Sequence, residues 1–146
     1  MDIMEFKYKT ELDYLLSLGL TLPDLSEPKD KIAYRFIFKS IPEKNHIPAY
    51  IQKPRRALSD IERSKATTSG YALSCFEEED KAKERFQALA SNFRNIKKTI
   101  GDSISVGTII FSDGLISLAD TKTTHFDLYE FCECNLSNTF VYKEEL

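Results

Sequence analysis

The stretch of sequence that decides the fold covers residues 70–100 and reads GYALSCFEEEDKAKERFQALASNFRNIKKTI. Residues 71–76 form a short apolar run of strand length, and four acidic residues follow, which suit the first turn of a helix. Apolar residues then recur every three or four positions until two lysines and Gly101 mark the end of the helix. The pattern predicts a strand that leads into one helix of about five to six turns. The apolar positions are Ala82, Phe86, Leu89, Ala90, Phe93 and Ile96.

The chain after this helix has β character. Apolar and polar residues alternate over residues 104–111, which is the period of a strand with one buried face. The Asp-Gly pair at residues 113–114 is a strong hairpin signal, so we expect residues 115–118 to return alongside the preceding strand. Residues 125–131 alternate again, and residues 139–142 are expected to form a last strand.

The chain before the helix holds one short helix and one clear strand. Residues 10–19 carry a stripe of leucines and end in a glycine, which is typical of an amphipathic helix with a glycine after its last turn. Residues 31–39 alternate as a strand, and a second, shorter strand is expected at residues 49–51. The face of the first strand that we expect to be buried carries Ile32, Tyr34, Phe36 and Phe38.

Length and element order together indicate the fold class. The chain has 146 residues, 42% of them hydrophobic, which suits a single domain with a sizeable core. Strands outnumber helices and mostly follow one another, which indicates an α+β fold. We expect residues 1–146 to form one domain, with a mostly antiparallel sheet of five or six strands packed on one long helix, plus a short N-terminal helix.

Several absences favour a cytoplasmic protein without a cofactor. The first residues are acidic and are not followed by an apolar stretch, so we expect no signal peptide, and no apolar run is long enough to span a membrane. Three cysteines, an odd number, favour reduced thiols. Cys132 and Cys134 lack the spacing of a zinc half-site, and Cys75 is expected in the core. No glycine-rich phosphate loop is present, and neither a metal nor a bound cofactor is expected.

The charges of the chain are unevenly distributed. Residues 53–68 lose all apolar periodicity and are predicted to form a basic surface loop, in which Arg55, Arg56 and Arg63 are the candidate partner-binding residues. Residues 113–146 hold seven acidic residues against two lysines. This polarity favours a protein partner or a homodimer. Nucleic acid is a weaker alternative, because the loop contains no aromatic residue for stacking on bases.

Candidate catalytic residues lie on the predicted strands. His125 and Asp127 are two residues apart, so their side chains share one face of a strand and could act as a base and its orienting acid. A solvent-facing row is the alternative. Arg35 interrupts an apolar strand and, if buried, needs a carboxylate or phosphate partner. Ser74 lies near the end of the strand before the long helix.

In chain order, Arg35, Ser74 and Glu130 resemble the arginine, serine and glutamate series of ADP-ribosyltransferase-like domains. There, an arginine on an early strand and a serine-bearing strand bind nicotinamide dinucleotide, and a late glutamate acts on the ribose. Residues 70–90 are also similar to the central block of that family. The chain departs from the family pattern because Ser74 is not in a Ser-Thr-Ser context and because alternation places Glu130 on the buried face of its strand.

Two hypotheses about function follow. The first is a small cytoplasmic, non-catalytic protein-interaction domain of an accessory, immunity or inhibitor type. The alternative is a small enzyme that acts on a nucleotide or nucleic acid, with an ADP-ribosyltransferase-like site. The enzyme hypothesis requires the candidate side chains to line one concave pocket. Its catalytic candidates are Arg35, Ser74, His125, Asp127 and Glu130.

Overall fold

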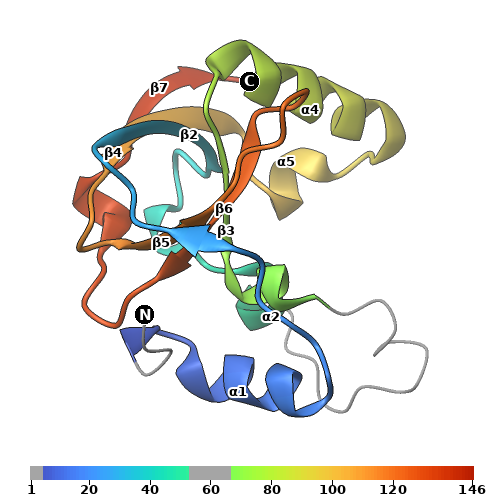
Figure 1. The fold of residues 1–146 in the computed structure, drawn as a ribbon. Coiled ribbons are helices and arrows are strands. Elements are labelled where there is room, and N and C mark those ends of the chain that lie inside the picture. The colour runs from blue at the N-terminus through green and yellow to red at the C-terminus, as the bar shows by residue number, and fades with distance from the viewer. Residues whose placement is uncertain (1–4, 53–66) are drawn as a thin grey trace.

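One antiparallel sheet organises the protein (Figure 1). The computed structural model describes residues 5–52 and 67–146. Within them the sheet has seven strands in the order β1-β5-β6-β3-β2-β4-β7, so the α+β class is confirmed and the sheet is larger than predicted. The strands are β1 (Leu25–Ser26), β2 (Lys31–Ile37), β3 (Leu73–Phe76), β4 (Ser103–Ile109), β5 (Gly114–Ser117), β6 (His125–Glu130) and β7 (Val141–Glu145).

The helices lie at opposite ends of this sheet. Figure 1 shows α4 and α5 at one end and α1 at the other, below β5. None of the helices in the described residues is both long and apolar enough to cross a membrane. The helices are α1 (Lys9–Ser17), α2 (Ala49–Gln52), α4 (Glu79–Asn92) and α5 (Ile96–Thr99). Short 3-10 helices are η2 (Pro42–Lys44), η3 (Thr68–Tyr71) and η4 (Leu136–Asn138).

The predicted strand-to-helix unit is present as β3 and α4, but the single long helix is interrupted. Helix α4 ends at Asn92, and Phe93 has an extended backbone and is 59% exposed. The side chains of Ser91 and Asn92 donate hydrogen bonds to carbonyl groups of the preceding turn. Such side chains compete with the helical backbone and favour helix ends. The helix therefore stops, and α5 forms separately.

The sheet is nearly divided between β2 and β3. These two strands pair at a single position, Tyr34 with Phe76, whereas β2 and β4 pair over seven positions. We call β1, β5, β6 and β3 the first half-sheet, and β2, β4 and β7 the second half-sheet. Beyond the shared pair the strands diverge, and the guanidinium group of Arg35 donates to the backbone oxygen of Ser74 across the opening.

The predicted hairpin at residues 113–114 is wrong. Strand β4 pairs with β2 and β7, whereas β5 pairs with β6 and β1, so the chain crosses from one half-sheet to the other between β4 and β5. Asp113 instead closes a local turn, because its carboxylate accepts from the backbone N–H of Ile110 and its own N–H donates to the Ile110 oxygen.

The buried face of β2 is also the opposite of the one predicted. Ala33, Arg35 and Ile37 are buried, whereas Ile32 is 57% exposed. The face with Ala33 packs in a core that both half-sheets share, while Phe36 on the other face contacts α4 through Phe86, with ring centroids 5.6 Å apart. The short strand predicted at residues 49–51 is the helix α2, which starts after a proline.

Candidate functional site

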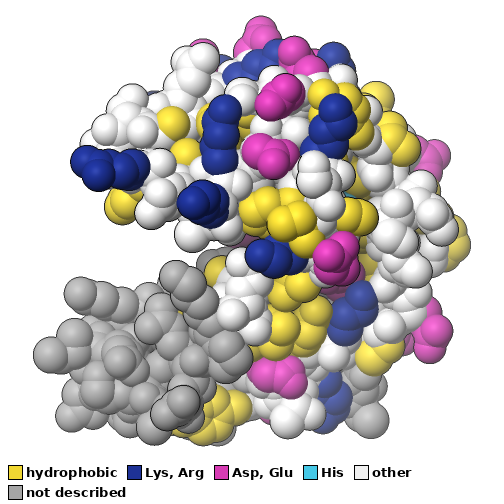
Figure 2. Space-filling view, turned by 180° about the vertical axis from the view of Figure 1, so that it is seen from behind, with side chains coloured by type: hydrophobic (Ala, Val, Ile, Leu, Met, Phe, Trp, Pro, Cys, Tyr) yellow, Lys and Arg dark blue, Asp and Glu magenta, His cyan; other side chains and the backbone are white. Residues whose placement is uncertain are grey.

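A cleft of about 660 Å³ opens where the two half-sheets separate. Helices α2, α4 and α5 contribute further walls. Figure 2, seen from behind, shows the molecule hollowed below the lobe that carries α4 and α5. The cleft brings together four of the five predicted catalytic residues, namely Arg35, Ser74, His125 and Asp127.

Arg35 is a buried cation at the edge of this cleft. The residue is 7% exposed on β2, where the hydroxyl of Ser105 on β4 donates to its backbone oxygen. Its Nε donates to Nδ1 of His46 at 3.0 Å, and its Nη1 donates to the backbone oxygen of Ser74. Both partners are neutral. Among the described residues no carboxylate pairs with this guanidinium group, so the carboxylate partner that a buried Arg35 was expected to need is not present there.

Ser74, His125 and Asp127 form a polar group on the neighbouring half-sheet. In the register of β3 and β6, Ser74 lies opposite Asp127 and Phe76 opposite His125. The Ser74 hydroxyl lies 2.5 Å from His125 Nε2, which in turn lies 3.6 Å from Asp127 Oδ1. The expected sharing of one strand face by His125 and Asp127 is confirmed.

The environment of Asp127 makes its carboxylate a stronger base than that of a free aspartate. Burial raises the pKa of this carboxyl group, and His125 opposes the shift only in part. A carboxylate with a raised pKa beside a serine and a histidine is an arrangement suited to proton transfer. Asp127 is therefore the acidic side chain best placed to act in the cleft.

Glu130 lies outside the cleft. It is the last residue of β6, and its alternation places it on the face opposite Asp127, as the sequence pattern predicted. Its Oε2 pairs with Lys7 Nζ at 2.8 Å. Of the three residues that resemble the series of ADP-ribosyltransferase-like domains, Arg35 and Ser74 therefore line the cleft and Glu130 does not.

The cleft also contains residues that the sequence did not single out. Arg85 on α4 provides a second cation, and the rings of Tyr50 and Phe76 provide flat apolar surfaces. Arg85 lies within the polar face of a helix, where nothing local distinguishes it from other exposed charges. His46 accepts a hydrogen bond from Arg35 but does not line the cleft; it follows a turn and belongs to no sequence pattern. Burial, and then Arg35, lowers its pKa to about 3.

Residues 53–66 of the predicted partner-binding loop are not among those that the structure describes. Arg55, Arg56 and Arg63 lie outside the described residues. Among the described side chains on the face in Figure 2, lysines and arginines are interspersed with acidic residues and form no continuous basic stripe. Cys75 is buried, as expected. Residues 5–52 and 67–146 contain no group of three or more metal-ligating side chains.

Comparisons with family models, with curated proteins and with solved structures found no match to this chain.

Proposed function

We propose that the chain is a small enzyme that binds a nucleotide in the cleft between its half-sheets, in a manner similar to ADP-ribosyltransferase-like domains. One observation carries the proposal: the buried guanidinium of Arg35 borders the cleft without a carboxylate partner among the described residues. A buried charge without a counterion is costly, and a phosphate group is a partner that matches the guanidinium geometry.

The other walls of the cleft suit the remaining parts of a nucleotide. Arg85 supplies a second positive charge, and Tyr50 offers a ring for stacking on a base. The hydroxyl of Ser74 and the carboxyl of Asp127 can hydrogen-bond to ribose hydroxyl groups. A volume of about 660 Å³ lies in the range of small-molecule sites.

The resemblance to ADP-ribosyltransferase-like domains suggests the reaction. With nicotinamide dinucleotide as substrate, the bond between ribose C1′ and the nicotinamide nitrogen breaks, and nicotinamide leaves with the electron pair. The oxygen of water or of an acceptor then bonds to C1′, and its proton passes to the Asp127–His125 pair. Asp127 takes the part that the sequence resemblance gave to Glu130.

The test measures binding and turnover separately. Wild type is titrated with NAD⁺ and with ATP by calorimetry, and nicotinamide release is followed by liquid chromatography. We expect Asp127→Asn to retain NAD⁺ binding and to lose nicotinamide release by about 100-fold or more. Arg85→Ala should weaken binding about tenfold, whereas the exposed Arg94→Ala serves as the matched control and should not.

Each outcome bears on a different part of the proposal. Binding of ATP without NAD⁺ binding would support a nucleotide site and exclude ADP-ribosyl chemistry. If wild type binds neither nucleotide at millimolar concentration, the proposal is overturned. The protein-interaction hypothesis, which rests on the basic loop at residues 53–68 and on the acidic residues 113–146, stays a prediction.

A further inference from the structure

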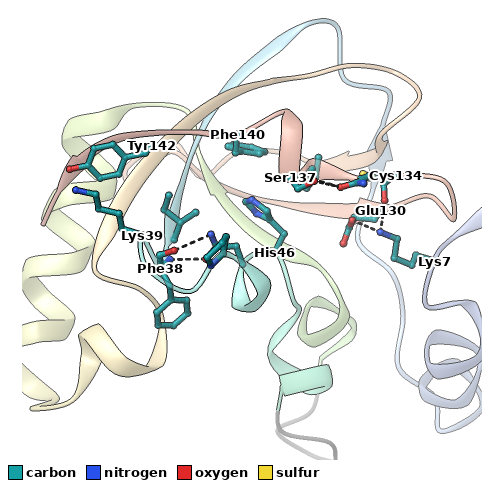
Figure 3. A pocket seen from close by; sticks show the side chains of 14 residues that line it. Lys7, Phe38, Lys39, His46, Glu130, Cys134, Ser137, Phe140 and Tyr142 are labelled. Carbon is teal, nitrogen blue, oxygen red and sulfur yellow. Dashed lines mark hydrogen bonds and ion pairs between the residues drawn. The ribbon is translucent and has the colours of Figure 1, made fainter.

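A second pocket, of about 460 Å³, shares no lining residue with the cleft. Figure 3 shows it bordered by the end of β2, the turn that holds His46 and the segment around η4. The N-terminal Lys7 reaches its far side and bonds to Glu130 and to the backbone oxygen of Cys134. The proposed catalytic residues play no part in this pocket.

Glu130 brings an unsatisfied acceptor to this pocket. Glu130 is 4% exposed, and Lys7 pairs with only one of its two carboxylate oxygens, Oε2. The other oxygen, Oε1, is buried and accepts no hydrogen bond of good geometry among the described residues, although the Cys134 thiol is close enough for Glu130 to raise its pKa. Buried acceptors are nearly always hydrogen-bonded, because an unpaired one loses its water without compensation. An orphan oxygen of this kind in a pocket wall indicates a missing donor.

His46 brings a hydrogen-bond donor to the same pocket. Its Nδ1 accepts a hydrogen bond from Arg35, so the proton of the neutral ring is on Nε2. This N–H has no partner among the described residues. Burial lowers the pKa of His46 to about 3, so the ring is neutral at physiological pH. Figure 3 shows His46 and Glu130 on facing sides of the pocket.

Aromatic side chains complete the arrangement. The ring of Phe140 packs against that of His46, with centroids 5.3 Å apart, and Phe38 and Tyr142 also line the pocket. The pocket therefore presents the Glu130 acceptor, the His46 N–H and aromatic side chains, beside further polar side chains. These are Lys7, Lys39, Asn45, Asn135 and Ser137. A planar ligand with adjacent N–H and C=O groups matches the acceptor, the N–H and the aromatic side chains.

We propose that this pocket is a second binding site, for a small planar molecule with a primary carboxamide or the equivalent edge of a nucleobase. The ligand N–H donates to Glu130 Oε1, its carbonyl oxygen accepts from His46 Nε2, and its ring lies against Phe140. A carboxylate ligand should bind more weakly, because it offers no donor to Glu130 Oε1, even though Lys7 and Lys39 also line the pocket.

The probe is benzamide, with benzoate as its isosteric counterpart. We expect benzamide to shift the backbone amide signals of His46 and of residues 135–140 in a ¹⁵N-labelled sample, with benzoate causing smaller shifts at the same concentration. Glu130→Gln should weaken benzamide binding about tenfold. The exposed Glu84→Gln is the matched control and should leave the affinity unchanged.

The signal map separates this site from the cleft, so it also separates the two proposals. Benzamide shifts confined to Ser74, His125 and Asp127 would overturn the second site and leave the nucleotide proposal standing. Equal binding of benzoate would also overturn it, and this comparison uses only wild type, so it holds even if Glu130→Gln does not fold. The second site survives a negative NAD⁺ titration, because the two pockets share no residue.

Discussion

Replacing Lys7 by methionine should destabilise the fold strongly, although the residue lies near the start of the chain. Lys7 Nζ bonds to Glu130 Oε2 at 2.8 Å and to the Cys134 oxygen at 2.6 Å. The Glu130 side chain is 3% exposed, and that of Lys7 is 28% exposed. Removing one partner of a buried pair costs roughly 3–5 kcal/mol, because a buried charge is left without compensation. The partial exposure of Lys7 lets water approach, so we expect about 3 kcal/mol, the lower end of this range.

The assay is urea unfolding followed by far-UV circular dichroism, since the chain contains no tryptophan. A loss of about 3 kcal/mol corresponds to a fall of roughly 6–12 °C in melting temperature for a domain of this size. Lys81→Met is the control: its pair with Glu84, at 3.5 Å on an exposed helix face, should contribute under about 0.5 kcal/mol. The double variant Lys7→Met/Glu130→Met should recover to within about 1 kcal/mol of wild type, because no charge stays buried.

Two results would refute this reasoning. The first is a cost for Lys7→Met no larger than that of Lys81→Met. The second is a double variant as unstable as the sum of its single changes, which would show that packing at Glu130, and not charge compensation, carries the stability.

Three further predictions concern the backbone, the cleft and the thiols. Gly101→Ala should destabilise the fold by roughly 1–3 kcal/mol in urea unfolding, because the residue has φ +131° and its added Cβ would lie 2.5 Å from the Ile37 oxygen; a cost near zero would contradict this geometry. Burial raises the pKa of Asp127, so wild-type stability falls as pH rises through that pKa. Asp127→Asn should therefore melt at a higher temperature than wild type at neutral pH, with the difference shrinking in acid, and a lower melting temperature at neutral pH would count against it. One thiol, that of Cys132, should react rapidly with a chromogenic disulfide in the native protein, since the other two are buried; rapid reaction of all three would contradict this burial.

The sequence predicted best where local chemistry and packing agree. In the segment from β3 to α4, the apolar run, the acidic first turn and the helical period point to the same structure, and the fold follows them as far as Asn92. The shared face of His125 and Asp127 followed from the strand period alone. The α+β class followed from the order of these elements.

The errors arose where pairing between distant segments decides the outcome. The Asp-Gly signal at residues 113–114 reports a tight turn, but it cannot report which strands pair on either side of it. Both faces of β2 are covered to some degree, so alternation could not tell the face with Ala33 from the face with Phe36. Alternation showed that Arg35 needs a partner if it is buried. Which side chains lie near it depends on the strand order, and among the described residues no acidic side chain pairs with it.

The near-division of the sheet has a consequence for how the chain folds during synthesis. The second half-sheet takes its strands from three separated segments, Lys31–Ile37, Ser103–Ile109 and Val141–Glu145. It therefore cannot close until the residues of β7 have left the ribosome. Until then β4 presents an open edge, which is a template for pairing with another chain. Deletion of β7 should therefore produce aggregation more readily than a soluble shortened domain, and folding should be slow because distant contacts dominate.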